Sequence, residues 1–241
     1  MRYFIHLAYN GTRFCGWQIQ PKSPSIQESI EDVMSTLLNE KISIVGAGRT
    51  DSGVHASNYY AHFETNAEFS EEQLRYKMNR MLPYDIVIYQ IYAVPDDMHA
   101  RFSATSRTYT YTITKKKNPF NAETEYYVPT QLNVHAMNES CKQLIGTKDF
   151  TSFSKLHTDV NNNICTITLA EWHETDDKLI FTISANRFLR NMVRSIVGTL
   201  IDVGKEKISQ TDFVNIIESK NRQNAGQSIP ACGLCLTEIY Y

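Results

Sequence analysis

One glycine-rich stretch, Gly46–Ala56 (GAGRTDSGVHA), combines the side chains that could carry out chemistry. Its glycines permit positive φ angles and let a ligand approach the backbone closely. A carboxylate on such a loop can point outward as a nucleophile or base, and a neighbouring guanidinium favours its charged form. We therefore identify Asp51 as the candidate catalytic residue and Arg49 as its nearest basic neighbour. The alternative is a turn aspartate that hydrogen-bonds its own backbone, with Arg49 as an ordinary surface charge.

The same stretch does not match the known phosphate-binding loops. It lacks the third glycine of the dinucleotide-binding fingerprint and the Gly-Lys-Ser/Thr ending of a P-loop. No nucleotide cofactor is therefore expected. Strand-like runs at 42–45 and 59–63 flank the stretch and predict a loop between two strands.

A second loop, Tyr9–Gln20, contains two glycines, an arginine, three amides and the aromatic residues Phe14 and Trp17. This mixture suits the binding of a flat, polar ligand. It is equally typical of a packed turn in which Phe14 and Trp17 are buried.

The elements that must position these loops follow from periodicity and capping. Apolar residues at helical spacing predict helices over 25–38, with a capping box at Ser25–Glu28, and from Ser70 to Pro83. Further helices are predicted over about 133–145 and 188–203, and a short one opens at Ser209–Asp212. Strands are predicted at 2–9, 42–45, 59–63, 86–92, 108–114, 164–171, 179–184 and 234–240, and a polar loop at 161–163.

This order of elements suggests two successive βαββαβ units. The predicted fold class is α/β (α+β), with two ferredoxin-like halves whose mainly antiparallel sheets border a central basic cleft. The expected domains are residues 1–104, which carry the Asp51 loop, and 105–241. A cleft between two such halves is the expected ligand site.

Basic residues are concentrated in two segments, although the formal net charge is only −2, with 24 basic and 26 acidic residues. Residues 101–122 contain five basic residues and no acidic one, and 186–194 contain Arg187, Arg190 and Arg194. If both segments border one cleft, they present a basic groove to a phosphate backbone. For Lys115–Lys117 alone, a solvated strand end is the favoured interpretation.

Arg194 is the arginine for which the sequence most strongly predicts an acidic partner. The predicted helix places it on one face with Arg187, Arg190 and Asn191, among apolar neighbours. An arginine in apolar surroundings requires a partner, and Asp51 is the obvious candidate. Such a pair would keep the carboxylate charged and oriented.

Cysteine usage and the absence of long apolar runs indicate a soluble cytoplasmic protein. The five cysteines are odd in number and scattered, which does not suggest a disulfide framework. The strand-like start carries no signal core, and no run approaches the length of a membrane span. Cys232–Cys235 is formally a CxxC pair, but no second pair accompanies it and no metal site is expected. His55 and His62 are interpreted as loop and strand-end residues rather than ligands.

Five spaced motifs together resemble the TruA family of tRNA pseudouridine synthases, over residues 3 to 240. They are Tyr9-x-Gly-Thr-x-Phe-x-Gly-Trp-Gln, Gly48-Arg-Thr-Asp-Ser-Gly-Val-His55, His99-Ala-Arg-Phe-Ser-Ala104 with Tyr109 beyond it, Asn186-Arg-Phe188 leading to Met192-Val-Arg194, and Gly233-Leu234. The resemblance implies the pseudouridine synthase fold and an isomerase that detaches uracil from ribose, turns it and rejoins it through carbon. It implies no cofactor, no metal, and a homodimer that acts on the anticodon stem-loop of tRNA, at positions following the anticodon.

The resemblance also assigns a role to individual residues. Asp51 matches the nucleophilic aspartate, which either attacks the ribose anomeric carbon or assists elimination to a glycal. Tyr109 matches the tyrosine that stacks on the flipped base and can take a proton, and Arg49 the arginine that assists base flipping. Arg194 matches the basic partner of the aspartate, and Leu234 the apolar residue packed against the base. Arg187 and Arg190 are expected to contact substrate, and Arg190-Asn191 departs from the residues of other members.

Two other classes of function remain as alternatives. A non-catalytic RNA-binding module would stack bases on Tyr109, Phe14 and Trp17, but the adjacent exposed aromatics of an RNA-recognition strand are absent from the sequence. A hydrolase that uses Asp51 as nucleophile usually needs a second carboxylate or a metal. No acidic residue lies between Glu40 and Asp51 or from Ser52 to Tyr60.

Overall fold

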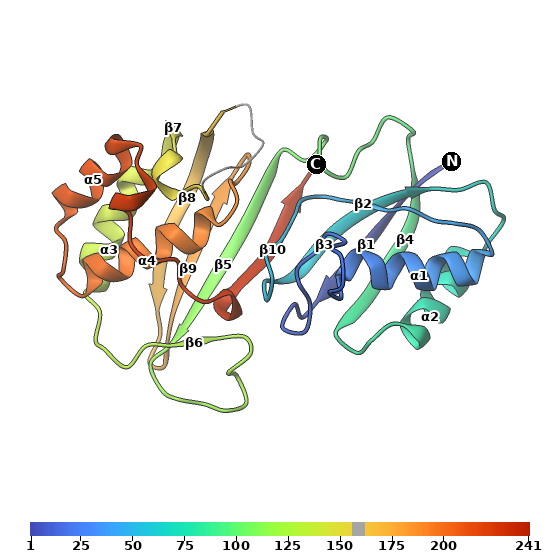
Figure 1. The fold of residues 1–241 in the computed structure, drawn as a ribbon, viewed down its shortest axis with the longest axis horizontal. Coiled ribbons are helices and arrows are strands. Elements are labelled where there is room, and N and C mark those ends of the chain that lie inside the picture. Colours follow the sequence, from blue (N-terminus) through green and yellow to red (C-terminus); the bar gives the residue numbers. More distant parts are fainter. Residues whose placement is uncertain (156–161) are drawn as a thin grey trace. The chain divides into compact units, whose positions relative to one another are not determined.

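The structure, a computed structural model, describes residues 1–155 and 162–241. The chain forms two compact units (Figure 1). Unit 1 comprises residues 1–105 and 235–241, and unit 2 comprises residues 106–234. The final seven residues thus belong to unit 1 although they follow unit 2 in the chain. Of the polar loop expected at 161–163, Asn161 lies outside the described residues.

Unit 1 is built on an antiparallel sheet with the strand order β4-β1-β3. The elements are β1 (Arg2–Tyr9), α1 (Ile26–Leu38), β2 (Val45–Gly46), β3 (His55–Glu64), α2 (Glu71–Met81) and β4 (Ile86–Val94). The two-residue β2 pairs antiparallel with β3, and β10 (Leu234–Tyr240) pairs parallel with its start, Cys235 opposite His55. The order β4-β1-β3-β2 is that of a ferredoxin-like unit.

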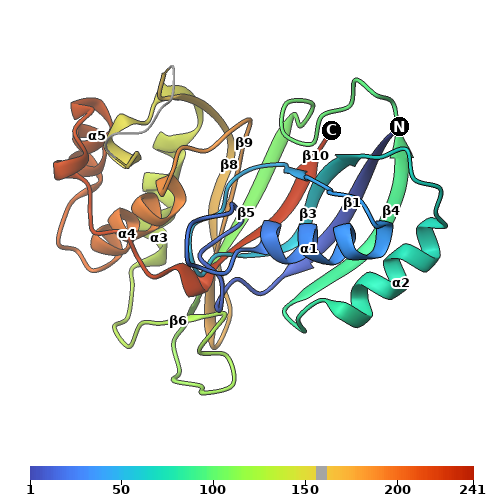
Figure 2. The same ribbon diagram turned by 45° about the vertical axis from the view of Figure 1, so that its right-hand side comes forward.

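Helices α1 and α2 cover one face of this sheet (Figure 2). The hydroxyl of Ser25 accepts from the Glu28 amide at 3.2 Å and caps α1, so Ser25 acts as the predicted N-cap. Ile26, Ile30 and Met34 form the buried stripe of this helix. Helix α2 begins after Ser70 as predicted and ends before Pro83, which cannot continue a helix.

The strand predicted at 42–45 is wrong except for Val45. Ile42 and Ile44 are buried, which explains the strand-like pattern, but their backbone groups bond to side chains of α1. Ser35 Oγ accepts from the Ile42 amide at 2.9 Å. Glu31 Oε1 accepts from the Ile44 amide at 2.8 Å, and Gln27 Nε2 donates to the Ile44 carbonyl at 3.1 Å. Side chains of α1 thus form the hydrogen bonds that the backbone of a neighbouring strand would otherwise form with this segment.

Unit 2 contains a second sheet, with the antiparallel order β5-β9-β8-β7. Its elements are β5 (Ser106–Thr114), β6 (Tyr126–Tyr127), α3 (Val134–Cys141), β7 (Gly146–Asp149), β8 (Ile164–Glu174), β9 (Lys178–Ala185), α4 (Met192–Gly204) and α5 (Gln210–Ser219). Short 3-10 helices lie at Lys142–Leu144, Thr151–Phe153, Arg222–Asn224 and Ala231–Gly233. Helices α3, α4 and α5 pack together on one side of this sheet (Figure 1). Both units therefore confirm the predicted α+β class with mainly antiparallel sheets.

Helix α4 begins four residues later than predicted. Asn191 is its N-cap residue and adopts the left-handed conformation (φ 65°). Arg187 and Arg190 therefore precede the helix, and the predicted helical face that joins them to Arg194 is wrong. The apolar run that suggested a longer helix includes Leu189, which is buried in the turn that leads into Met192. As at Ile42 and Ile44, apolar residues that are buried outside regular secondary structure mimic the pattern of a helix or strand.

No helix among the described residues is both long and apolar enough to cross a membrane.

Protonation of His62 is expected to destabilise unit 1. His62 is 5% exposed, and its Nδ1 accepts from the Ala100 amide at 3.1 Å. Burial, and the charges of His99 and Arg2, lower the pKa of His62 from 6.5 to about 4. The unfolded chain thus binds a proton between pH 6.5 and about 4 that the folded chain does not. The free energy of unfolding should be highest above pH 6.5 and decrease as the pH falls to about 4.

Urea unfolding at pH 7 and pH 5 measures this effect, with a His62→Gln variant as the comparison. The variant should be less stable at pH 7 and should lose less stability than the parent chain between the two values. An equal loss in both proteins would contradict the assignment to His62.

Candidate active site

The Asp51 loop in unit 1 is fixed on both sides of the carboxylate. It spans residues 47–54 between β2 and β3, so it is shorter than predicted because β3 already begins at His55. Thr50, immediately before Asp51, is buried, and its Oγ1 lies 3.0 Å from the Tyr9 hydroxyl. The Tyr59 hydroxyl donates to the Gly48 carbonyl, and the Val54 amide donates to the Asp51 carbonyl at 3.2 Å. The backbone around Asp51 is thereby held in one arrangement, with its side chain half-buried and Arg49 exposed.

The Tyr9–Gln20 loop is hydrogen-bonded to the Asp51 loop through its backbone. Gly53 and Trp17 donate backbone N–H groups to the carbonyls of Phe14 and Thr50, at 3.3 and 3.4 Å. Phe14 and Trp17 are only 6% and 3% exposed, and the Trp17 ring lies 4.3 Å from that of Tyr59. The packed-turn interpretation of this loop is therefore confirmed, and these aromatics are not available to grip a ligand.

Replacement of Gly16 by alanine is expected to displace the Asp51 loop. Gly16 has φ +100°, and a Cβ there would lie 2.2 Å from the Thr50 carbonyl oxygen. An L-residue is strained at this φ, and the contact is with backbone that cannot rotate away. We expect Gly16→Ala to lower the free energy of unfolding by about 2–4 kcal/mol. Chemical denaturation measures the loss.

Gly48→Ala provides a matched control in the same region, since a Cβ at Gly48 meets nothing within 4 Å. Its effect should stay below about 1 kcal/mol. Equal losses in the two variants would refute the close approach of the two loops.

Tyr109 lies on β5 of unit 2, opposite Ile183 of β9, and is half-buried. Its ring meets that of Phe188 edge-on, with centroids 5.2 Å apart. Arg107, two residues earlier on the same strand, donates to the Asn186 carbonyl at 2.9 Å and ties β5 to the segment that contains Phe188. Tyr109 thus forms an edge-to-face aromatic pair with Phe188 of the segment that Arg107 joins to β5.

Arg194 and Leu234 are linked through one backbone segment of unit 2. Arg194 Nε donates to the Ile229 carbonyl at 2.7 Å. The Tyr111 hydroxyl donates to the next carbonyl, that of Pro230, at 2.8 Å, four residues before Leu234. Leu234 is 5% exposed and begins β10. Neighbouring Gly233 has no room for a side chain, because a Cβ would lie 2.7 Å from Tyr111 Cζ.

The predicted site residues thus fall into two groups. Arg49 and Asp51 share a loop in unit 1, whereas Tyr109, Arg187, Arg190, Arg194 and Leu234 belong to unit 2. Arg187 is half-buried and Arg190 is exposed. The pairing of Asp51 with Arg194 would join the two units and stays a prediction.

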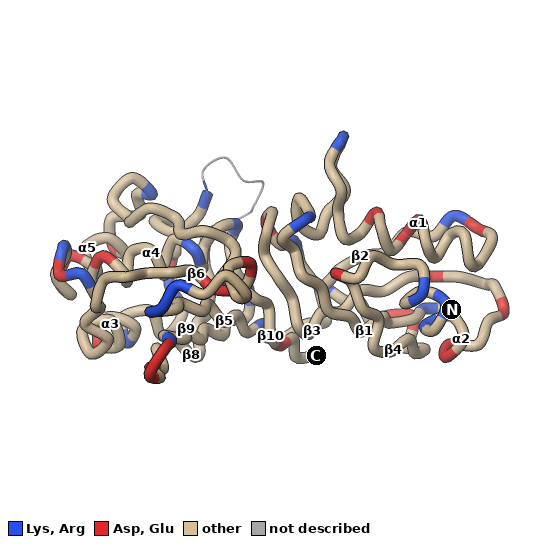
Figure 3. The backbone as a smooth tube through the Cα atoms, turned by 90° about the horizontal axis from the view of Figure 1, so that it is seen from below, with Lys and Arg blue, Asp and Glu red and all other residues tan. Residues whose placement is uncertain are grey.

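Acidic partners reduce the basic character of the Lys115–Lys117 triplet. Lys115 Nζ lies 2.7 Å from Glu174 Oε1, and Lys116 Nζ lies 2.6 Å from Asp177 Oδ1. These pairs support the solvated strand end. Acidic and basic positions are interspersed along each unit (Figure 3).

Cys232 and Cys235 are not joined by a disulfide, and burial raises the pKa of each thiol. Among residues 1–155 and 162–241, no group of three or more potential metal ligands comes together.

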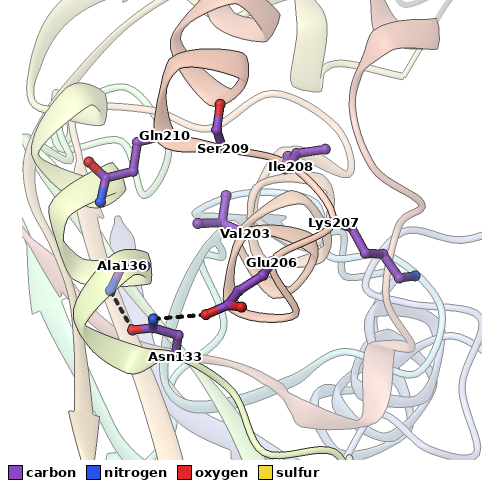
Figure 4. A pocket seen from close by; sticks show the side chains of 8 residues that line it. All are labelled: Asn133, Ala136, Val203, Glu206, Lys207, Ile208, Ser209 and Gln210. Carbon is purple, nitrogen blue, oxygen red and sulfur yellow. Dashed lines mark hydrogen bonds between the residues drawn. The ribbon is translucent and has the colours of Figure 1, made fainter.

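A cavity of about 300 Å³ lies among the helices of unit 2 (Figure 4). It is lined by Asn133, Ala136, Val203, Glu206, Lys207, Ile208, Ser209 and Gln210. Asn133 bridges it, accepting from the Ala136 amide at 3.0 Å and donating to Glu206 at 3.3 Å. No predicted site residue lines this cavity, and two of its polar residues are helix caps, Asn133 of α3 and Ser209 of α5.

Comparison with known proteins shows similarity along the whole chain. The family model described as "tRNA pseudouridine synthase" matches residues 6–103 and 140–241. The "tRNA pseudouridine synthase A" of Parabacteroides distasonis is 52% identical over 241 residues, covering 100% of this chain and 96% of its own length. The protein of the same name from Bacteroides fragilis is 51% identical over 242 residues, with the same coverage. That from Bacillus subtilis is 40% identical over 245 residues, covering 100% and 99%.

Proposed function

The chain belongs to the tRNA pseudouridine synthase family, and we propose that it converts uridine to pseudouridine in the anticodon stem-loop of tRNA. The observation that carries the proposal is the fixed backbone on both sides of Asp51, held by Thr50, Gly48 and Val54. A carboxylate that must meet one carbon atom of an extruded nucleotide gains rate from such preorganisation.

The reaction breaks the bond between N1 of uracil and C1′ of ribose and forms a bond between C5 and C1′. The electron pair of the broken bond stays on uracil, the hydrogen at C5 leaves as a proton, and N1 takes up a proton from solvent, so no oxidant or reductant is needed. Asp51 either bonds to C1′ or removes a ribose proton to give a glycal, and each route uses the charged carboxylate. Arg194 would pair with that carboxylate, and no step requires a metal or cofactor.

The remaining residues would hold the nucleotide. A base inside a stem must leave the helix to reach Asp51, and exposed Arg49 is suited to replace it there. Tyr109 would stack on the base and receive a proton, and Leu234 would pack against the base. Arg187 and Arg190 would contact phosphates of the stem. We further propose that the protein acts as a homodimer in the cytoplasm, where tRNA is its substrate.

Mapping pseudouridine in an unmodified tRNA transcript tests this proposal. After incubation with the protein, carbodiimide treatment and primer extension should stop at uridines just after the anticodon. A transcript with cytidine at those positions is the control and should give no stops. Stops elsewhere would contradict the anticodon location. Binding without any stops would favour the alternative of a non-catalytic RNA-binding module.

A further inference from the structure

A backbone segment of unit 2, residues 225–230, lies directly on helix α4. We call it the clamp segment. A Cβ at Gly198 of α4 would lie 2.0 Å from the Gln227 carbonyl oxygen, and a Cβ at Gly226 would lie 3.0 Å from Thr199 Cα. Glycine at both positions therefore lets the two backbones touch. The clamp segment therefore lies in direct backbone contact with α4 at these two positions.

Hydrogen bonds join the clamp segment to the N-cap of α4 and to residues within the helix. The Gly226 amide donates to Thr199 Oγ1 at 2.9 Å, and Asn191 Nδ2 donates to Ser228 Oγ at 2.6 Å. Between them, the Ile229 carbonyl accepts from Arg194 Nε at 2.7 Å, and the Ile229 amide donates back to the Arg194 carbonyl at 3.4 Å. Because a guanidinium is planar, its Nε contact sets the direction in which the two Nη groups point.

Arg222 also donates hydrogen bonds to the clamp segment. Its Nη1 donates to the carbonyls of Ala225 and Gly226, at 3.3 and 3.1 Å. Its Nη2 donates to Ser228 Oγ at 2.9 Å, the oxygen that also accepts from Asn191. All of these acceptors are neutral, and the arginine is half-buried. This guanidinium therefore shapes a backbone turn, which a single ammonium group cannot do with the same fork of donors.

We propose that Arg222 is a positioning residue for Arg194: by folding the clamp segment it places the Ile229 carbonyl that orients the Arg194 guanidinium. The inference rests on the proposed function, in which Arg194 holds the catalytic carboxylate. It adds to that function a residue outside the predicted site, 28 positions further along the chain than Arg194. Without Arg222, the Ile229 carbonyl can shift and Arg194 loses its fixed direction.

Steady-state kinetics and tRNA binding test the proposal, because a positioning residue should affect kcat much more than the Kd for tRNA. Arg222→Ala should lower kcat by about 10- to 100-fold, because the Arg194 guanidinium is no longer held in one direction. The Kd for tRNA should change less than about threefold. Arg222→Lys should retain activity between that of Arg222→Ala and the parent chain. If Arg222→Ala fails to fold, kcat and the Kd for tRNA are compared between Arg222→Lys and the parent chain instead.

Asn138→Ala supplies a matched structural control in the same unit. Asn138 also makes a polar staple, donating to the Trp172 carbonyl at 3.0 Å and accepting from its amide at 2.7 Å, but it joins α3 to β8. Its loss should lower the melting temperature and leave kcat unchanged. An equal loss of kcat in the Asn138 and Arg222 variants would reduce Arg222 to a structural residue and overturn the proposal.

A second comparison places the Arg222 change in an Arg194→Lys background, where the Nε donor is already absent. If Arg222 acts through Arg194, its replacement there should cost less than about a further twofold. A full additional loss, or an Arg222 variant with the kcat of the parent chain, would refute the positioning role. An inactive parent chain would instead refute the proposed function, so the two failures are distinguishable.

Discussion

Replacing Asp51 with asparagine should abolish pseudouridine formation, with kcat lowered by at least about 10⁴-fold, while the Kd for tRNA changes less than about threefold. The amide is nearly the same size as the carboxylate and should leave the loop intact. That loop is held by its backbone and by Thr50, Tyr9 and Tyr59 rather than by the Asp51 side chain alone. The amide can neither bond to C1′ nor remove a ribose proton, so the variant has no nucleophile or base for the chemical step.

Single-turnover measurement with enzyme in excess, together with tRNA binding by filter retention, separates these two effects. Asp85→Asn is the matched control, because Asp85 is another carboxylate of unit 1 and pairs with Arg13 at 2.5 Å. This variant should keep the activity of the parent chain. Residual turnover by Asp51→Asn within tenfold of the parent chain would show that Asp51 is not the reacting group.

Replacing Arg194 with alanine should lower kcat by about 10²- to 10³-fold with little change in tRNA affinity. Loss of the guanidinium would leave the catalytic carboxylate without its proposed partner and free to rotate. The side chain is half-buried and tied to Ile229, so its role is local rather than a general attraction for RNA. The measurement is kcat and KM on a tRNA transcript across the variants.

Arg190→Ala provides the contrast for this prediction. Arg190 is exposed and precedes α4, so its loss should raise KM and leave kcat within about threefold. Full activity of Arg194→Ala would show that the proposed pair with Asp51 is wrong. A rise in KM alone would make Arg194 a phosphate contact like its neighbour.

The sequence predicted most elements because local signals and burial agree there. Helix α2 has an N-cap serine, an apolar stripe and a terminating proline, and each signal acts within the helix. The failures occur where burial and secondary structure separate. Ile42 and Ile44 are buried without a strand, and Leu189 is buried before α4 begins. A pattern of apolar residues reports burial, and it reports a helix or strand only when the backbone follows the same period.

The candidate site shows the same division. The Asp51 loop was predictable because glycines and charged residues adjoin in the sequence. The structure adds the support that Tyr59 gives through Gly48, and the three acceptors that Arg222 gathers in the clamp segment. These contacts join residues through tertiary packing, and no spacing or composition encodes them. The sequence of the Tyr9–Gln20 loop is compatible both with ligand binding and with a packed turn, and the burial of Phe14 and Trp17 shows the packed turn.

The central claim, that this chain isomerises uridine through Asp51, is tested most directly by tritium release. A tRNA transcript that carries tritium at C5 of its uridines is incubated with the parent chain and with Asp51→Ala and Asp51→Asn. We expect release to water by the parent chain, because C5 loses its hydrogen when it bonds to ribose, and none by either variant. Binding of tRNA by the parent chain without any release would contradict isomerisation by this chain, and release by the Asp51 variants at the parental rate would contradict the role of Asp51.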